Sequence, residues 1–233
     1  MRKIAAFAAL VALTLSLTVT PVLAVISQGN AAITRLWAGD DPACSASYPM
    51  IQTGYDENLV YVLSAGHCTV ANYAKRDVTD SVLYKVDWRA VLLGRYGINR
   101  RVDVAIGTVP RPSELALHKR LWLADTMPRE GTVWIAGFPL AVESVVVAQV
   151  IGEDPELPGS VLIQVRDPYS VLPGSSGSAV LNKYGQIVGV VWGVRMAMNP
   201  ITFQGEPTGV VVVTPVEEVH KLLKLLSPPA TSS

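Results

Sequence analysis

The sequence predicts an all-β protein, arranged as an antiparallel barrel or sandwich, with one helix at its C-terminal end. Short runs rich in Val, Ile, Thr and Trp recur along the chain, and Gly, Pro, Asn and Asp separate them. The last stretch before the C-terminus has the amphipathic pattern of a helix. Half of the 233 residues are hydrophobic, which is enough for a substantial core.

The expected strands follow one another at the spacing of an antiparallel all-β fold. In order they are residues 31–38, 59–64, 82–93, 102–109, 132–137, 144–151, 160–165, 178–181, 186–192 and 209–213. The Asn-Lys-Tyr-Gly segment at 182–185 predicts a hairpin turn in which Gly185 takes a positive φ.

The helix is expected over residues 215–226. Thr214 is its expected N-cap, and Pro215 suits the first helical position. Glu217 follows three residues after the cap, as in a capping box. The apolar residues beyond it share one face, which we expect to dock on the β body: Val216, Val219, Leu222, Leu223 and Leu226.

The first residues have the pattern of an export signal. Arg2 and Lys3 supply positive charge, residues 4–19 are almost entirely apolar, and the Val-Leu-Ala segment at 22–24 suits signal peptidase. We expect a signal peptide over 1–24 and a mature chain that is secreted or periplasmic, with no membrane attachment after cleavage. The alternative is an uncleaved signal anchor, because the apolar run is only slightly shorter than a membrane span.

The composition limits the partners of the mature chain, residues 25–233. Over the full chain of 233 residues, Lys plus Arg and Asp plus Glu both total 19, so its net charge is zero and indicates neither nucleic acid nor an anionic membrane as a partner. The three His and two Cys have no metal-ligand spacing, so we expect no metal and no other cofactor. The sequence does not indicate an oligomeric state.

Cys44 and Cys68 are the two cysteines of the chain. An even number of cysteines in an exported protein favours a disulfide. The bond would close a loop of about two dozen residues and stabilise the fold by roughly 3 kcal/mol. The alternative is two unpaired, buried thiols.

Three short segments carry the functional argument. His67 follows an apolar run in the segment Ser-Ala-Gly-His-Cys, and Asp103 begins the apolar run Asp-Val-Ala-Ile. Ser176 lies in the glycine-flanked segment Pro-Gly-Ser-Ser-Gly-Ser. Each segment alone is more often structural than catalytic. Together, in the order His, Asp, Ser, they match the chain order of a chymotrypsin-type triad.

These segments resemble the Thr-Ala-Ala-His-Cys, Asp-Ile-Ala and Gly-Asp-Ser-Gly-Gly motifs of the chymotrypsin/trypsin family of serine proteases, in its bacterial secreted form. Residues 190–193 are similar to the family's Ser-Trp-Gly segment, and residues 208–210 to the pocket wall that follows it. The resemblance implies two six-stranded antiparallel β-barrels with the active site between them. They would cover about 31–110 and 124–214, because prolines and charged residues interrupt the strands around 108–124.

The resemblance also implies a role for each candidate residue. A serine hydroxyl is a poor nucleophile at neutral pH, so Ser176 would need His67 as a general base. Asp103 would fix the tautomer of the imidazole and stabilise the imidazolium. The backbone N–H groups of Gly174 and Ser176 would form the oxyanion hole.

Three residues depart from the family pattern. Ser175 replaces the aspartate that pairs with a new N-terminus in the digestive enzymes, so we expect a loop that forms without propeptide processing. Val191 replaces a serine that helps to hold the catalytic aspartate, so the support for Asp103 must come from elsewhere. Ser178 replaces the second glycine of the loop.

The residues of the specificity pocket are located by their distance along the chain from the motifs that resemble those of the family. Its expected residues are Ser170, Val191, Trp192, Gly193 and Gly209, with Val171 nearby. Ser170 stands six residues before the candidate nucleophile, where trypsin-type enzymes carry Asp. Because Lys or Arg would lack a counter-charge there, we expect an endopeptidase that cleaves proteins or peptides after a large apolar or aromatic residue.

Alternatives remain for each role. Asp87 is the second candidate acid, whereas His118 and His220 are expected on the surface or in packing. Ser175 and Ser178 flank the candidate nucleophile. The alternative function is a catalytically inactive family member that binds peptides or a protein in the same cleft. An esterase with the α/β-hydrolase fold would need its serine before the acid and the histidine, which is the reverse of this order.

Overall fold

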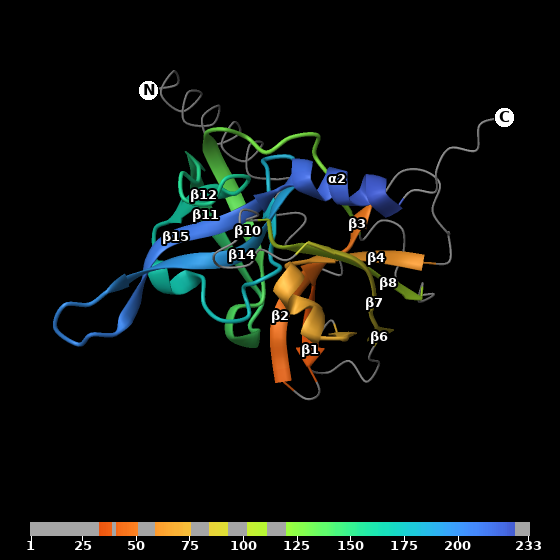
Figure 1. Cartoon of the computed structure of the whole chain (residues 1–233), viewed down its shortest axis with the longest axis horizontal. Coiled ribbons are helices and arrows are strands. Elements are labelled where there is room, and N and C mark those ends of the chain that lie inside the picture. Colours follow the sequence, from red (N-terminus) through yellow and green to blue (C-terminus); the bar gives the residue numbers. More distant parts are fainter. Residues whose placement is uncertain are drawn as a thin grey trace, which may run out of the picture.

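A computed structural model of the chain describes residues 33–38, 41–50, 59–75, 84–92, 102–110 and 120–226. The expected signal peptide and His118 lie outside these residues. The described residues form a seven-stranded sheet from the N-terminal half, a closed six-stranded barrel from the C-terminal half, and the helix α2 (Val216–Leu226) (Figure 1). The predicted all-β class with a C-terminal helix is therefore confirmed.

The N-terminal sheet is antiparallel throughout. Its strands lie in the order β6 (Tyr84–Lys85), β5 (Tyr73–Lys75), β1 (Ile33–Ala38), β2 (Asp41–Ser47), β4 (Leu59–Ser64), β8 (Val104–Pro110) and β7 (Asp87–Leu92). This is one strand more than the six expected. The strand expected over 82–93 is split at Val86, which is buried between β6 and β7.

The strand β2 was not predicted, because its sequence Asp-Pro-Ala-Cys-Ser-Ala-Ser contains no β-branched or aromatic residue. It is extended because it pairs with β1 along its length and with β4 at Ser47. Tertiary pairing therefore overrides a weak local propensity here.

The C-terminal barrel closes through the pairing of its first and fourth strands in chain order, β10 with β13. Around the barrel the strands are β10 (Gly131–Gly137), β11 (Ser144–Glu153), β12 (Val161–Val165), β15 (Gly205–Pro215), β14 (Ile187–Met198) and β13 (Ala179–Leu181). Its interior is filled mainly by valines and isoleucines, such as Ile135, Ile163 and Val188. The predicted turn is confirmed, because Gly185 has a φ of +75° and its N–H donates to Asn182.

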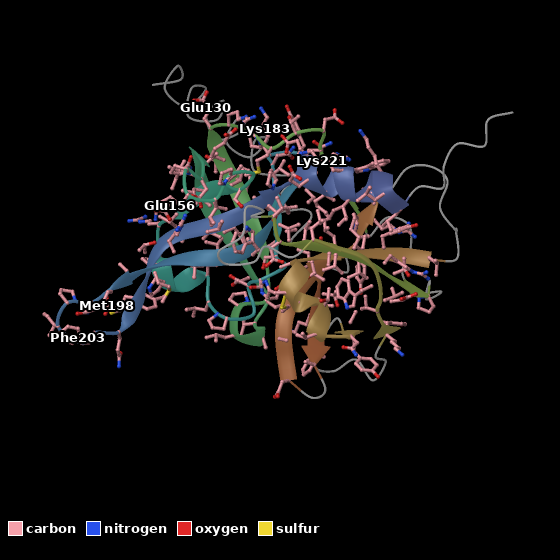
Figure 2. All side chains as sticks on the ribbon, in the orientation of Figure 1. Glu130, Glu156, Lys183, Met198, Phe203 and Lys221 are labelled. Carbon is pink, nitrogen blue, oxygen red and sulfur yellow. A yellow bond between two sulfur atoms is a disulfide. The ribbon has the colours of Figure 1, made fainter. Side chains whose placement is uncertain are left out.

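The hairpin of β14 and β15 is longer than predicted. The strands were expected to end near Trp192 and to resume at Gly209, yet pairing continues to Met198 and Gly205. Figure 2 shows Met198 and Phe203 at the far end of this hairpin, where both side chains are exposed. The extension carries little buried apolar surface, so it has no clear strand pattern in the sequence.

The helix α2 begins at Val216, one residue later than predicted, because Pro215 still belongs to β15. Thr214 does not cap it, so this prediction was wrong, and the hydroxyl of Thr214 binds the backbone of Asp103 instead. The apolar face of α2 packs, as predicted, into a cluster that contains residues of both β units, such as Leu63 and Ile187. The helix thereby fastens the two units together.

A short parallel pair completes the fold, formed by β3 (Pro49–Met50) and β9 (Leu121–Trp122). Within the residues that the structure describes, 3₁₀ helices lie at Gly66–Val70, Pro139–Ala141 and Pro168–Ser170. None of the described helices is both long enough and apolar enough to cross a membrane.

Candidate active site

His67 and Asp103 form a close pair where β4 ends and β8 begins. His67 lies in the 3₁₀ helix that follows β4, and its Nδ1 is 2.7 Å from Oδ2 of Asp103. The other carboxylate oxygen accepts the backbone N–H of His67 at 2.9 Å. The Asp103 side chain is 4% exposed and that of His67 is 45% exposed. Because a carboxylate accepts at Nδ1, the proton resides there and Nε2 is left as an acceptor.

Asp103 is held by a residue of the other β unit. The hydroxyl of Thr214, near the end of β15, accepts from the N–H of Asp103 at 3.2 Å and donates to its C=O at 3.1 Å. This contact supplies the support that Val191, in place of a serine, cannot give. Gly66 allows the close approach, since a Cβ there would lie 2.5 Å from Oδ1 of Asp103.

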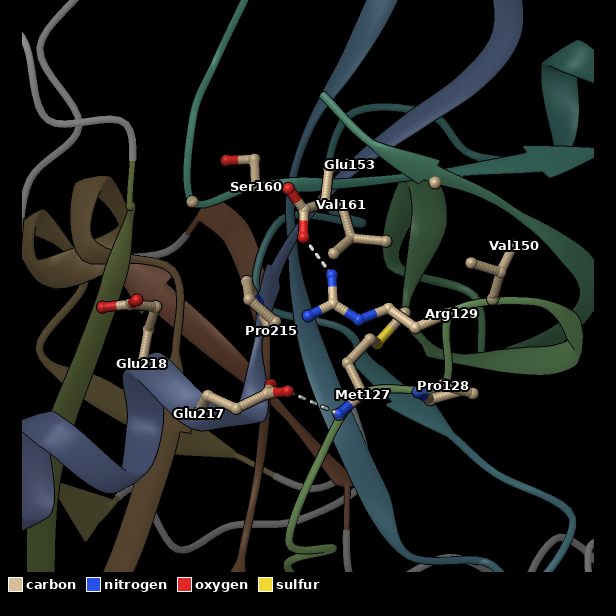
Figure 3. Close-up of a pocket in the computed structure, with 12 residues that line it drawn as sticks. Met127, Pro128, Arg129, Val150, Glu153, Ser160, Val161, Pro215, Glu217 and Glu218 are labelled. Atoms are coloured by element: carbon tan, nitrogen blue, oxygen red, sulfur yellow. Dashed lines mark hydrogen bonds and ion pairs between the residues drawn. The ribbon is translucent and has the colours of Figure 1, made fainter. Parts of the chain in front are cut away.

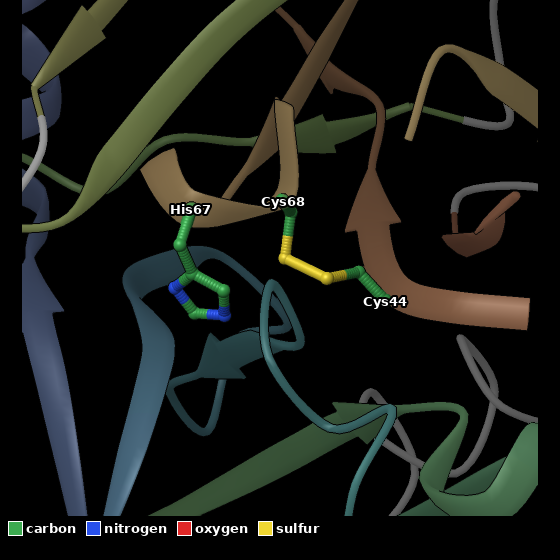
Figure 4. Close-up of side chains that lie close together, drawn as sticks. All are labelled: Cys44, His67 and Cys68. Carbon is green, nitrogen blue, oxygen red and sulfur yellow. A yellow bond between two sulfur atoms is a disulfide. The ribbon is translucent and has the colours of Figure 1, made fainter. Parts of the chain in front are cut away.

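The predicted disulfide between Cys44 and Cys68 is present and joins β2 to the 3₁₀ helix of His67 (Figure 4). A ring nitrogen of His67 lies within 4.8 Å of both sulfur atoms. The bond therefore fixes the position of the histidine-bearing turn relative to Cys44 and its neighbour Ser45.

The loop that bears Ser176 has every carbonyl from Pro173 to Ser176 engaged. The C=O of Pro173 accepts from the N–H of Leu140 at 2.9 Å, and that of Ser175 accepts from the N–H of Ser178 at 2.9 Å. The other two accept from Ser45: its hydroxyl donates to Gly174 at 2.7 Å, and its N–H donates to Ser176 at 2.7 Å.

Two N–H groups of the same loop, those of Gly174 and Ser176, donate to no residue that the structure describes. In a trans peptide the C=O and the N–H point in opposite directions. The N–H of Gly174 therefore points away from Leu140, which holds the carbonyl of Pro173 in the same peptide unit. The N–H of Ser176 likewise points away from the donor that holds the carbonyl of Ser175.

The three serines of the loop differ in exposure. Ser175 is 4% exposed and its hydroxyl accepts from the N–H of Leu172, at 3.2 Å. Ser178 is fully buried, and its hydroxyl lies so close to Gly137 that a Cβ there would overlap it. Ser176 is partly exposed, so it is the serine of this loop that solvent and a ligand can reach.

Asp87 and His220, two further candidates that the structure describes, have structural partners. Asp87 is exposed and pairs with Arg89 at 2.7 Å, as expected for a solvated strand face. The Nε2 of His220 lies 2.8 Å from the C=O of Ala124, so this ring serves packing of the terminal helix.

A pocket of about 270 Å³ lies beside Ser176, which is one of its lining residues. Of the expected specificity residues, Val191 and Gly193 line this cavity, whereas Ser170, Trp192 and Gly209 do not. Lining residues that were not predicted come from the loop before Ser176 and from the extended hairpin: Tyr169, Leu172, Pro173, Val194, Met196 and Pro207. No described residue that lines the pocket is charged.

The three expected pocket residues have other surroundings. The hydroxyl of Ser170 donates to the C=O of Asp167 at 2.6 Å. Gly209 has a φ of +78°, and a Cβ there would lie 2.6 Å from the side chain of Gln164. Trp192 packs against the core of the N-terminal sheet. Alignment to the family motifs could not predict that these three residues lie outside the cavity, because their positions depend on how the loops and the hairpin fold.

A second cavity, of about 190 Å³, lies between the start of α2 and the barrel (Figure 3). Glu217, which the sequence assigned to a capping box, accepts from the N–H of Met127 at 3.1 Å here. Arg129 pairs with Glu153 at the rim. None of the candidate catalytic residues lines this cavity.

Similarity to known proteins comes from structure alone. No protein-family model matches the chain, and no curated protein matches its sequence. The chain is similar to the Rv3671c protease of M. tuberculosis in its active form, with a TM-score of 0.56, 19% identity, and coverage of 89% of this chain and 85% of that chain. The inactive form of that protease matches with a TM-score of 0.57 and 16% identity, over 88% of this chain and 93% of that chain.

Two further proteases match in the same way. Kallikrein-related peptidase 10 has a TM-score of 0.60 and 15% identity, over 84% of this chain and 95% of that chain. The HtrA-type protease AlgW, solved with a decapeptide, has a TM-score of 0.57 and 15% identity, over 86% of this chain and 65% of that chain. Two β units, a terminal helix and these neighbours together show that the chain has the fold of the trypsin-like serine proteases.

Proposed function

We propose that the chain is a serine endopeptidase that hydrolyses peptide bonds through an acyl-enzyme, with His67, Asp103 and Ser176 as its catalytic triad. One observation carries the proposal: the serine-bearing loop, with two free N–H groups, is anchored to Ser45, the residue next to the disulfide that holds the turn of His67. The two halves of the candidate site thus meet around the same dipeptide, Cys44-Ser45.

The chemistry follows from the tautomer that Asp103 imposes. Nε2 of His67 takes the hydroxyl proton as the Ser176 oxygen attacks the substrate carbonyl. The carbonyl oxygen becomes an oxyanion, and the N–H groups of Gly174 and Ser176 would donate to it. The imidazolium then returns its proton to the leaving amine, which leaves an ester on Ser176. Water then attacks the ester carbonyl while His67 takes its proton. His67 passes that proton to the oxygen of Ser176, and the ester bond breaks to release the carboxylic acid product.

The pocket beside Ser176 supports a preference for an apolar or aromatic residue before the scissile bond. Its lining is uncharged, and Val194 and Met196 supply apolar walls. A Lys or Arg side chain would lose hydration there without gaining a counter-charge. Gly193 leaves this space open, since a Cβ there meets only Val212, at 4.0 Å. In a panel of peptides that vary at this position, Phe, Tyr, Leu and Met are expected to outperform Lys and Arg.

We also propose that the chain is exported, with residues 1–24 removed as a signal peptide and residues 25–233 forming one protease domain. The disulfide between Cys44 and Cys68 supports this, because such bonds persist in secreted and periplasmic proteins. Peptides or proteins are the expected substrates, in line with the decapeptide bound to the similar protease AlgW.

The test is a fluorophosphonate probe, applied to the full chain and read by intact mass. A single adduct is expected on the wild type and on Ser175→Ala, and none on Ser176→Ala, because only an activated serine reacts with the probe. Ser175 is the matched control, since it neighbours Ser176 but is buried. A folded wild-type chain that takes no adduct would refute the proposal and leave a peptide-binding role for the cleft.

A further inference from the structure

We propose that Ser45 is the positioning residue that preforms the oxyanion hole, by holding the backbone of the Ser176 loop from the other β unit. This inference rests on the proposed function, since it assigns the free N–H groups of the loop to the oxyanion. Ser45 lies on β2 directly after Cys44 and is completely buried. Sequence analysis did not single it out, because nothing in the local pattern marks it.

Each polar group of Ser45 has a partner. Its N–H donates to the C=O of Ser176 at 2.7 Å, and its hydroxyl donates to the C=O of Gly174 at 2.7 Å. The same hydroxyl accepts from the N–H of Phe138 at 2.8 Å. The C=O of Ser45 accepts from the hydroxyl of Ser64 at 2.7 Å. Because Phe138 occupies the acceptor side of the hydroxyl, its proton is directed at Gly174.

The C=O of Gly174, which Ser45 holds, belongs to the peptide unit that follows Gly174. Gly174 has a φ of +96°, and glycine can rotate its adjoining peptide units at little cost. Rotation of the peptide before Gly174, whose carbonyl Leu140 holds, would turn the N–H of Gly174 away from the reacting carbonyl and remove one oxyanion donor. Ser175 stands where the resembling proteases use an aspartate, and its hydroxyl bonds within the loop, to Leu172. The hydroxyl of Ser45 therefore fixes the peptide after Gly174 while Leu140 fixes the peptide before it, so Gly174 is restrained on both sides.

The backbone packs closely around Ser45. A Cβ on Gly177 would overlap the C=O of Ser45, and a Cβ on Gly137 would lie 2.9 Å from its hydroxyl. Both neighbours are glycines, so the backbone of the loop and of β10 can approach Ser45 directly.

Ser47 is a buried serine of the same strand whose hydroxyl makes no hydrogen bond to a described residue. It lies two residues after Ser45, hence on the same face of the strand, and is also completely buried. Ser47→Ala is therefore a matched control, because it removes the same group from the same strand without releasing the loop.

The experiment compares Ser45→Ala and Ser47→Ala in the full chain, with a chromogenic peptide that carries Phe before the scissile bond. For Ser45→Ala we expect kcat to fall roughly 10-fold with KM within about twofold of wild type, because the loss acts on the oxyanion and not on the pocket. Ser47→Ala is expected to keep both constants. A general loss of folding would lower the active fraction in a probe titration instead of changing kcat per active site.

Hydrogen exchange of the segment 173–178 gives a readout that needs no activity. We expect faster exchange in Ser45→Ala than in Ser47→Ala, since the loop loses an anchor. If the wild type takes no fluorophosphonate, the proposed function fails while this comparison still decides whether Ser45 holds the loop. Equal exchange in the two variants, or a wild-type kcat in Ser45→Ala, would overturn the inference.

Ser64→Ala serves if Ser45→Ala does not fold. It removes the donor to the C=O of Ser45 but leaves the hydroxyl of Ser45 in place. A smaller fall in kcat, roughly threefold at unchanged KM, is expected, because Ser45 is loosened and not removed. A wild-type kcat in this variant would contradict the positioning role.

Discussion

The hydroxyl of Thr214 both accepts from the N–H of Asp103, at 3.2 Å, and donates to its C=O, at 3.1 Å. The two residues are 111 positions apart, and all of these groups are buried. Asp103 belongs to the N-terminal β unit and Thr214 to the end of the barrel. The acid of the candidate triad is therefore fixed across the junction between the two units.

Thr214→Val should lower the free energy of unfolding by about 2 kcal/mol, because the buried N–H and C=O of Asp103 lose their partner. We also expect a fall in kcat, since the carboxylate that orients His67 becomes less constrained. Chemical denaturation and steady-state kinetics measure the two effects. Thr34→Val is the control, as Thr34 is equally buried but its hydroxyl makes only a long contact, 3.4 Å, with Arg35. Equal stability losses in both variants would contradict the special role of Thr214.

Gly177→Ala should abolish probe labelling of Ser176 and destabilise the fold by about 3 kcal/mol. A Cβ there would overlap the C=O of Ser45 and the hydroxyl of Ser64, in addition to the strain of a φ of +85°. Gly131→Ala separates the two causes, because Gly131 has a φ of +95° but open space around its Cβ position. That variant should lose about 1 kcal/mol and keep its reactivity. Labelling of Gly177→Ala at the wild-type rate would contradict this geometry.

Loss of the disulfide should affect both stability and catalysis. The double variant Cys44→Ala, Cys68→Ala is expected to lose roughly 3 kcal/mol of unfolding free energy, since the bond closes a loop between residues 24 positions apart. The remaining folded fraction should show a lower kcat, because Cys44 precedes Ser45 and Cys68 follows His67. Treating the wild type with a reductant should reproduce both losses. A double variant with wild-type kcat per active site would show that the bond serves stability alone.

Arg195 joins the pocket wall to the turn after β11. Its guanidinium lies 2.8 and 2.7 Å from the two oxygens of Asp154, whose side chain is completely buried, and 2.6 Å from Glu156. Burial by itself lowers the pKa of Arg195, but hydrogen bonds and charge interactions with both acids together outweigh it and leave the pKa raised. Arg195 therefore stays positively charged at every working pH, and the buried carboxylate of Asp154 keeps its counter-charge.

Arg195→Gln should lower the free energy of unfolding by about 3 kcal/mol, because it leaves the buried carboxylate of Asp154 without a counter-charge. It should also raise KM for apolar peptides, since Arg195 stands between two residues of the pocket wall, Val194 and Met196. Arg129→Gln is the matched control. It breaks an exposed pair with Glu153, so its effect should stay within about 0.5 kcal/mol. Similar losses in both variants would refute the buried-pair argument.

Much of the fold could be predicted from local pattern. Residues 59–64 form the expected strand, the turn that ends at Gly185 has the expected φ, and the apolar face of α2 docks as expected. Where the pattern was weak, prediction failed. The strand β2 has small and polar residues and is extended only because its neighbours pair with it.

The candidate site also has a part that the sequence predicts and a part that it does not. His67, Asp103 and Ser176 stand out because their side chains and flanking glycines form recognisable segments. The pocket wall at Met196 and Pro207 does not, since it depends on where a long hairpin folds over the loop before Ser176.

The sequence by itself determined the all-β class, the terminal helix, the cysteine pair and the identity of the candidate catalytic residues. Only the tertiary structure decided what holds them: Thr214 on Asp103, and Ser45 on the carbonyls of Gly174 and Ser176. Thr214 and Asp103 are 111 positions apart, and Ser45 and Gly174 are 129 positions apart. These contacts form only when the two β units dock. A hydroxyl that accepts one hydrogen bond and donates another has no local signature along the chain, because its partners are distant in the sequence.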